Sequence, residues 1–271
     1  MIKQFESVAA FRADYIALRA VNPRADRGSN LSWYNNETEA QTLEKTLTGD
    51  KSLVPTAEAM LSQLDEEIYV PQRVWLASPA GARPCVPDAL RNIPTSMRRI
   101  VEEPDARQPI SIYVVSTSSA AISSSTLLRR GTAILALTLA LSRIRPISLY
   151  TLCALDGRDG ETIISARINT DPLDVAQACY TLTSAGFARR LTYNYSRMAN
   201  DFRGGWPSGM NYENPTPYWN YVKERLAPDP KKSLIIGAAQ LGDELLSHPV
   251  DWVKKQVKFF TQIEEGIEDE E

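Results

Sequence analysis

Histidine is nearly absent from this sequence, and cysteine is scarce. The 271 residues include one histidine, His248, and three cysteines, Cys85, Cys153 and Cys179. A single imidazole cannot build a multi-histidine zinc site, a two-histidine iron site or an HExxH protease. No cysteine stands in a CxxC spacing, which argues against a zinc ribbon and a disulfide framework. We therefore expect no metal, no cofactor and reduced thiols, as is typical of a cytoplasmic protein.

Long hydrophobic runs are missing as well. The most apolar stretch, residues 131–142, is bounded by arginines and is shorter than the about 20 residues that a bilayer requires. The first twenty residues mix apolar and charged side chains in the manner of an amphipathic helix, which does not fit a signal peptide. A composition with 43% hydrophobic and 23% charged residues excludes wholesale disorder. We expect a soluble protein without membrane contact.

The usual catalytic motifs are also missing. The sequence has no Walker loop, no GxGxxG and no nucleophile elbow. The segment 237–244 has spaced glycines but lacks the lysine of a phosphate-binding loop. Asp156 and Asp159 stand close together, but in a segment where aspartate forms turns. We therefore predict that the protein is not an enzyme.

Lysine is absent between Ser52 and Val222, whereas arginine is abundant. The segment 73–203 holds 16 arginines against 10 acidic residues. The net charge of −3 depends on the last eight residues, EEGIEDEE, which carry six acids; the remainder has 30 basic and 27 acidic residues, or +3. Arginine pairs phosphate bidentately and stacks on flat rings. A genomic preference for arginine codons would explain the arginine bias equally well, but not the acidic tail.

The hydrophobic pattern predicts an α/β fold with a mainly parallel sheet flanked by helices. Helical spacing occurs at 5–20, 36–48 and 56–68, which gives an N-terminal helical portion over 1–70. A short strand over 72–78 and a mostly irregular, proline-rich connection follow. The α/β core over 71–263 has strands and helices that alternate, with one hairpin at DGRDG. Its strands are expected at 109–116, 147–155, 161–168 and 233–239, and its helices at 124–144, 171–185 and 249–263. The tail, 264–271, is too charged to be buried and is expected to be disordered.

A serine-rich segment, 116–126, links a predicted strand to a predicted helix, with Arg129 and Arg130 one turn further on. Hydroxyls, a helix N-terminus and guanidinium groups together favour a phosphate oxygen. Alternatively, one serine caps the helix and the others fill a solvated loop. The order of strand, serine loop and helix also resembles the von Willebrand A-type domain. In that family the first position of the DxSxS metal motif is aspartate, but here it is Ser116, so the metal site would be lost.

Eight of the 22 aromatic residues lie between residues 193 and 221. Arginines at 189, 190, 197 and 203 are interleaved with them, an arrangement that suits stacking of unpaired bases with phosphate contacts alongside. The rings could equally pack a small subdomain or a subunit interface. Near the C-terminus, Lys254 and Lys258 share one face of a predicted helix. The acidic tail beyond them would compete for a cationic DNA site, recruit a partner or simply aid solubility.

Three segments carry a further resemblance: RPCVPDALRNIPTSMRR (83–99), YVVSTSSAAISSSTLLRRGTAILALTLAL (113–141) and the terminal EEGIEDEE. In these segments the chain resembles the single-stranded-DNA-binding RNA polymerase cofactors (Drc) of podoviruses that carry giant virion RNA polymerases. The resemblance implies a transcription cofactor in the host-cell cytoplasm that holds unwound promoter DNA and recruits a phage RNA polymerase.

The sequence therefore predicts a binder of single-stranded DNA whose second partner is the phage RNA polymerase; self-association is left open. The alternative is a metal-less von Willebrand A-like interaction or phage adaptor module that does not bind DNA. The residues predicted to contact DNA are Arg98, Arg99, Arg129, Arg130, Arg189, Arg190, Tyr193, Tyr195, Arg197, Arg203, Trp206, Lys254 and Lys258. Those predicted to face the partner protein are Glu264, Glu265, Glu268, Asp269, Glu270 and Glu271.

Overall fold

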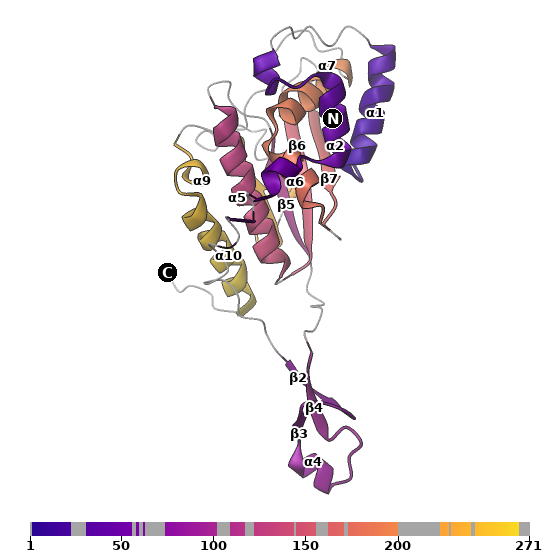
Figure 1. Ribbon diagram of the computed structural model, residues 1–271, viewed down its shortest axis with the longest axis vertical. Helices are drawn as coiled ribbons and strands as arrows, with labels where there is room; N and C mark the ends of the chain where they lie inside the picture. The colour runs from indigo at the N-terminus through magenta and orange to yellow at the C-terminus, as the bar shows by residue number, and fades with distance from the viewer. Residues whose placement is uncertain are drawn as a thin grey trace.

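The computed structural model (Figure 1) describes most of the chain. The described residues are 2–22, 31–55, 58–59, 62, 74–101, 109–116, 122–143, 145–155, 162–170, 173–199, 223–227, 229–239 and 242–265. Most of the helix predicted at 56–68, the boundary expected near residue 70 and the tail beyond residue 265 lie outside these ranges.

A five-stranded mixed sheet forms the centre of the molecule. Its strands are β1 (Ile2–Phe5), β5 (Ile110–Val115), β6 (Ile147–Leu155), β7 (Thr162–Ile168) and β8 (Ser233–Ile236), in the order β1-β7-β6-β5-β8. The pairs β1/β7, β5/β6 and β5/β8 are parallel, and β6/β7 is antiparallel. This arrangement confirms the predicted fold class, a mainly parallel sheet with one hairpin. It also adds β1, because the chain begins with a strand and its helix starts only at Val8.

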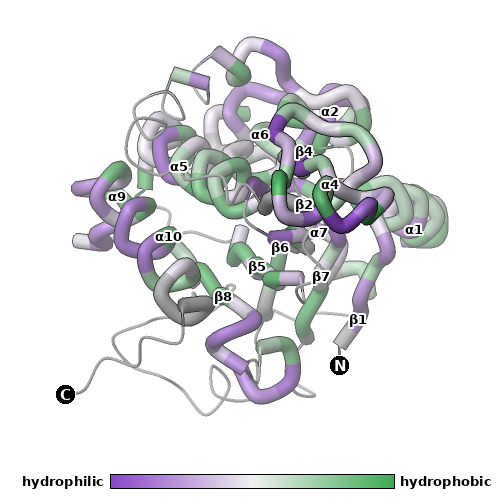
Figure 2. Tube along the Cα trace, turned by 90° about the horizontal axis from the view of Figure 1, so that it is seen from below, coloured by the Kyte–Doolittle hydropathy of each residue, from purple (hydrophilic) through white to green (hydrophobic). Residues whose placement is uncertain are grey.

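A helical turn over 223–226 lies on one face of this sheet, where Leu226 packs with Tyr113 and Val115. The other helices around it lie on the opposite side of the sheet (Figure 2). They are α1 (Val8–Val21), α2 (Glu39–Thr48), α5 (Ser124–Ser142), α6 (Val175–Thr183), the π-helix η4 (Gly186–Thr192), α7 (Tyr193–Ala199), α9 (Glu244–Ser247) and α10 (Pro249–Glu265). The short 3-10 turns η2 (Leu31–Tyr34) and η3 (Lys51–Leu53) flank α2. Several helices begin where the sequence supplies a cap: the side chains of Ser7, Thr38, Ser123 and Asp174 each accept a bond from a backbone N–H in the first turn.

The strands bury apolar side chains on both faces. Ile112 and Val114 of β5 point into the main core below the helices, whereas Tyr113 and Val115 pack in a second cluster with Leu226. This alternation follows from the two-residue period of a strand. Burial on both faces explains why β5 reads as a continuous apolar run in the sequence. In Figure 2 the strands are largely hydrophobic, whereas α9 and α10 carry many hydrophilic residues.

The N-terminal helical portion shares the main core. Phe11 and Tyr15 of α1 are fully buried and belong to the same core cluster as residues of β5, α5 and α6. The ring of Phe11 packs against Phe187, with centroids 5.9 Å apart. Since β1 also forms an edge of the main sheet, the described part of residues 1–70 is not a separate packing unit.

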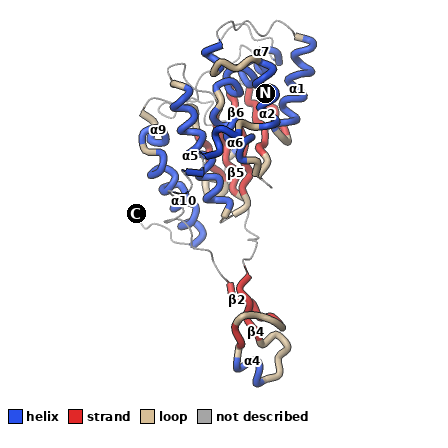
Figure 3. Tube along the Cα trace, in the orientation of Figure 1, coloured by secondary structure: helices blue, strands red, loops and turns tan. Residues whose placement is uncertain are grey.

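A second, three-stranded antiparallel sheet is formed by residues 74–101, which we call the arm. It contains β2 (Val74–Ser78), β3 (Arg83–Pro84), the short helix α4 (Val86–Leu90) and β4 (Met97–Val101), with β4 in the centre. Figures 1 and 3 show the arm apart from the five-stranded sheet. The expectation of a mostly irregular connection is wrong here. The prolines of the arm avoid the central strand and stand in turns, on the two-residue edge strand β3 and in the first turn of α4, where a missing N–H costs little.

The helix α5 is buried from Arg130 to Leu141, apart from the half-buried Leu139. Its close crossing with α6 requires glycine at position 131. A β-carbon there would lie 2.2 Å from Cγ2 of Thr183 and 2.9 Å from the carbonyl oxygen of Leu182. Both helices would have to move apart to accept a larger residue.

We expect Gly131→Ala to lower the free energy of unfolding by about 1–3 kcal/mol, because overpacking strains both helices. Urea denaturation followed by circular dichroism measures this change. Adding Thr183→Ser, which removes Cγ2, should restore part of the loss, and Thr183→Ser alone provides the control. An undiminished free energy of unfolding in Gly131→Ala would contradict the close crossing.

Candidate nucleic-acid interface

Arg130 is buried inside the fold, with 2% of its surface exposed. Its guanidinium donates to the carbonyl oxygen of Val115 at 3.4 Å and to that of Gly237. These carbonyls lie at the carboxyl ends of β5 and β8, so one side chain on α5 links two neighbouring strands. The structure therefore does not place Arg130 at the surface, where the predicted phosphate contact would be made, because backbone carbonyls hold its guanidinium inside the fold.

Arg190 and Tyr195 are also buried, which corrects their predicted role at the surface. The guanidinium of Arg190 lies over the ring of Tyr34, 4.0 Å from its centroid. Tyr195 donates its hydroxyl to Asp14 and accepts a bond from Lys3, whose ammonium lies 2.8 Å from the same carboxylate. This cluster holds β1 against the helices, and burial raises the pKa of Tyr195 to about 12.

Arg189 is half-buried. Its guanidinium donates to the carbonyl oxygen of Ile122 at 3.3 Å, directly before the cap of α5. Burial lowers the pKa of Arg189. The side chain thus binds the end of the serine-rich segment rather than projecting into solvent.

At both described ends of the serine-rich segment, a serine hydroxyl forms a hydrogen bond within the fold. Ser116 is buried and donates its hydroxyl to the carbonyl oxygen of Leu152 at 3.2 Å. Ser123 caps α5 by accepting a bond from the backbone N–H of Thr126 at 3.2 Å. This agrees with the alternative in which one serine caps the helix, while residues 117–121 lie outside the described part. Within the residues that the structure describes, no three His, Cys, Asp or Glu side chains are grouped as metal ligands would be.

The remaining residues predicted to contact DNA or the partner protein differ in exposure. Arg99, Arg129 and Lys258 are exposed, and Lys254 is half-buried on α10. Tyr193 and Arg197 lie on α7 and Glu264 and Glu265 end α10, but the side chains of these four fall outside the described part. Arg203, Trp206, Glu268, Asp269, Glu270 and Glu271 lie wholly outside it.

The arm carries an excess of positive charge. Between residues 74 and 101 there are four arginines and one aspartate, a net charge of +3. Arg98 pairs with that aspartate, Asp88, at 2.7 Å, whereas Arg83, Arg91 and Arg99 are exposed. Arg83 and Arg91 were missed among the predicted contacts, although the sequence of this segment already shows more arginines than acidic residues. The proline content of the segment concealed a folded unit that could carry them.

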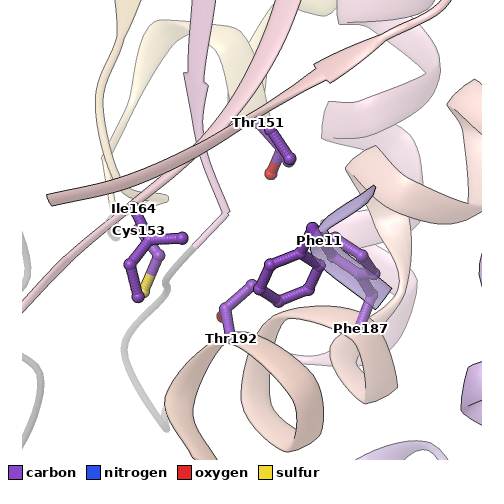
Figure 4. Close-up of a pocket in the computed structure, with 7 residues that line it drawn as sticks. Phe11, Thr151, Cys153, Ile164, Phe187 and Thr192 are labelled. Atoms are coloured by element: carbon purple, nitrogen blue, oxygen red, sulfur yellow. The ribbon is translucent and has the colours of Figure 1, made fainter. Parts of the chain in front are cut away.

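The small cavity in the core is lined by Phe11, Thr151, Cys153, Phe187 and Thr192, among others, as Figure 4 shows. The space between these side chains is too small to hold a water molecule. Burial raises the pKa of Cys153 to about 12, so its thiol stays protonated at neutral pH. The cavity is a packing gap beneath η4.

Residues 1–236 match a family model described as "Domain of unknown function (DUF7192)". The chain belongs to this family. The match spans the five-stranded sheet and the arm of the DUF7192 protein and ends at the last residue of β8, before α9 and α10. No match was found among curated proteins or among solved structures. In the described part of the DUF7192 protein, no helix has the length and apolarity needed to cross a bilayer.

Arg129 is exposed and its neighbour Arg130 is buried, so the same substitution at the two positions tests the effect of burial. We expect Arg130→Met to lower the free energy of unfolding by about 2–4 kcal/mol, because two buried carbonyls lose their donor. Arg129→Met should change it by less than about 0.5 kcal/mol, since that side chain is exposed. Thermal and urea denaturation measure both. Equal effects of the two substitutions would contradict the buried position of Arg130.

Proposed function

We propose that this DUF7192 protein is a non-enzymatic protein that binds single-stranded DNA, with the arm as its principal DNA contact. The observation that carries the proposal is the exposure of Arg83, Arg91 and Arg99 on one small unit with a net charge of +3. Phosphate contacts by such guanidinium groups supply most of the sequence-independent affinity for DNA.

The arm also offers apolar surface next to its charge. Val86, Leu90 and Ile93 are among the exposed large hydrophobic residues of the described part. Unpaired bases present flat apolar faces as well as phosphates, whereas the outside of a duplex presents mainly phosphates and groove edges. A surface that is both cationic and apolar therefore favours a single strand over an intact duplex.

We further propose a role in transcription, based on the resemblance to the phage polymerase cofactors. The first segment that resembles the phage polymerase cofactors, 83–99, coincides with β3, α4 and most of β4 of the arm. The second, 113–141, covers the end of β5 and nearly all of α5. We propose that the protein holds unwound promoter DNA on its arm and recruits a phage RNA polymerase through its acidic C-terminal residues.

Fluorescence anisotropy with a labelled oligonucleotide, as single strand and as duplex, tests DNA binding at about 50 and about 200 mM salt. We expect single-strand binding that weakens with salt. The triple substitution of Arg83, Arg91 and Arg99 to Gln should reduce the slope of log affinity against log salt by about 2, at about 0.7 per lost phosphate contact.

A matched control removes three exposed charges elsewhere, by substituting Lys51, Lys231 and Lys232 with Gln. This control should leave the slope closer to that of the unaltered protein. Absence of binding at low salt, or duplex binding at least as tight, would overturn the proposal. Absence of binding would favour the alternative of a metal-less von Willebrand A-like interaction module, which does not bind DNA.

The acidic tail gives a second prediction. Deleting residues 264–271 removes six negative charges. We expect single-stranded DNA to bind several-fold more tightly at low salt, and the difference to shrink as salt screens the charges. The same anisotropy titration measures it. Weaker binding after the deletion would show that the tail does not compete with DNA.

A further inference from the structure

We propose that the tip of the arm enters between stacked bases, so that the preferred DNA is a junction between duplex and single strand. This inference rests on the proposed DNA binding and goes beyond it, because it assigns to the apolar tip a role in opening base pairs. The tip consists of α4 and the turn that follows it, residues 86–93.

Three large apolar side chains stand exposed on this tip. Leu90 is 81% exposed, which is the highest value among the exposed large hydrophobic residues of the described part. Val86 is 60% exposed and Ile93 37%. Single exposed apolar residues are normal on any protein, but here three lie within eight residues, and Val86 and Leu90 are four apart on α4 and so share one face of the helix.

The tip is held in place rather than left as a loose loop. The carboxylate of Asp88 in α4 pairs with Arg98 of the central strand at 2.7 Å. The backbone N–H of Cys85 donates to the carbonyl of Ser96 at 2.7 Å, and that of Ile93 donates to the carbonyl of Asp88 at 3.0 Å. Because these bonds fix the helix on the sheet, little backbone freedom is lost when the tip meets a ligand.

The charge around the tip identifies the ligand. Arg91 directly follows Leu90, and Arg83 and Arg99 lie on the strands behind it, all three exposed. A second copy of the arm would bring a net charge of +3 against the same charge, which disfavours self-association through the tip. In DNA, stacked bases lie between two phosphate chains. The apolar side chains of the tip would contact the bases, and the flanking arginines would contact the phosphates.

Proteins that place Leu, Ile, Met or Pro between base steps unstack those steps and kink the duplex. The unstacking is least costly where one neighbour is already unpaired. A short apolar tip flanked by arginines should therefore act at the edge of an unwound region. That position agrees with a protein that holds melted DNA.

The test uses a forked duplex with 2-aminopurine at the junction, because its fluorescence rises when the base unstacks. We expect the intact protein to raise the signal and to bind the fork about tenfold more tightly than a single strand of equal length. In Val86→Ser/Leu90→Ser the signal and the fork preference should be lost, while the salt slope stays unchanged. Val21→Ser, at an exposed apolar residue at the end of α1, is the control.

Each outcome separates the two proposals. No binding of the intact protein to single strand or fork would overturn the proposed function itself. Binding without a fork preference, or a preference that survives Val86→Ser/Leu90→Ser, would overturn only the role of the tip. Self-association in analytical ultracentrifugation that is lost in that variant, with fork binding unchanged, would assign the tip to a protein contact and also overturn the inference.

Discussion

The fold depends on the burial of α5 between the sheet and the other helices. Its residues from Gly131 to Thr138 are all buried, so the helix needs the sheet, α6 and α10 around it at once. Arg130 stands where this helix meets the strand ends, and the carbonyls of Val115 and Gly237 stabilise its buried guanidinium there. The hydrogen bonds of this one side chain thereby link β5, β8 and α5.

The arginines of the described part differ in whether they are buried or exposed. Arg130 of α5 and Arg190 of η4 are buried and bind carbonyl groups and an aromatic ring inside the fold. Those on the arm, such as Arg83 and Arg99, remain in water. The arginines that produce the strong bias of the sequence therefore include buried side chains that donate internal hydrogen bonds and exposed side chains that carry surface charge. Only the exposed arginines are available to bind phosphate.

Sequence reasoning predicted the α/β class, the main strands and the long helices, because their apolar runs and caps are local signals. It missed β1, since four residues before an amphipathic helix carry no strand pattern of their own. It missed the sheet of the arm, since prolines in turns and edges resemble those of an irregular chain. It placed Arg130, Arg190 and Tyr195 at the surface, because whether a polar residue finds an internal partner depends on tertiary packing that spacing does not encode.

The base of the arm has a topological consequence. Val74 pairs with Val101, so the chain enters and leaves the arm at adjacent positions on neighbouring antiparallel strands. The arm is thus a closed insertion ahead of β5, and no strand of the five-stranded sheet hydrogen-bonds to it in the part of the chain that the structure describes. Such an insertion can vary in length, charge and tip chemistry while the main core keeps its packing.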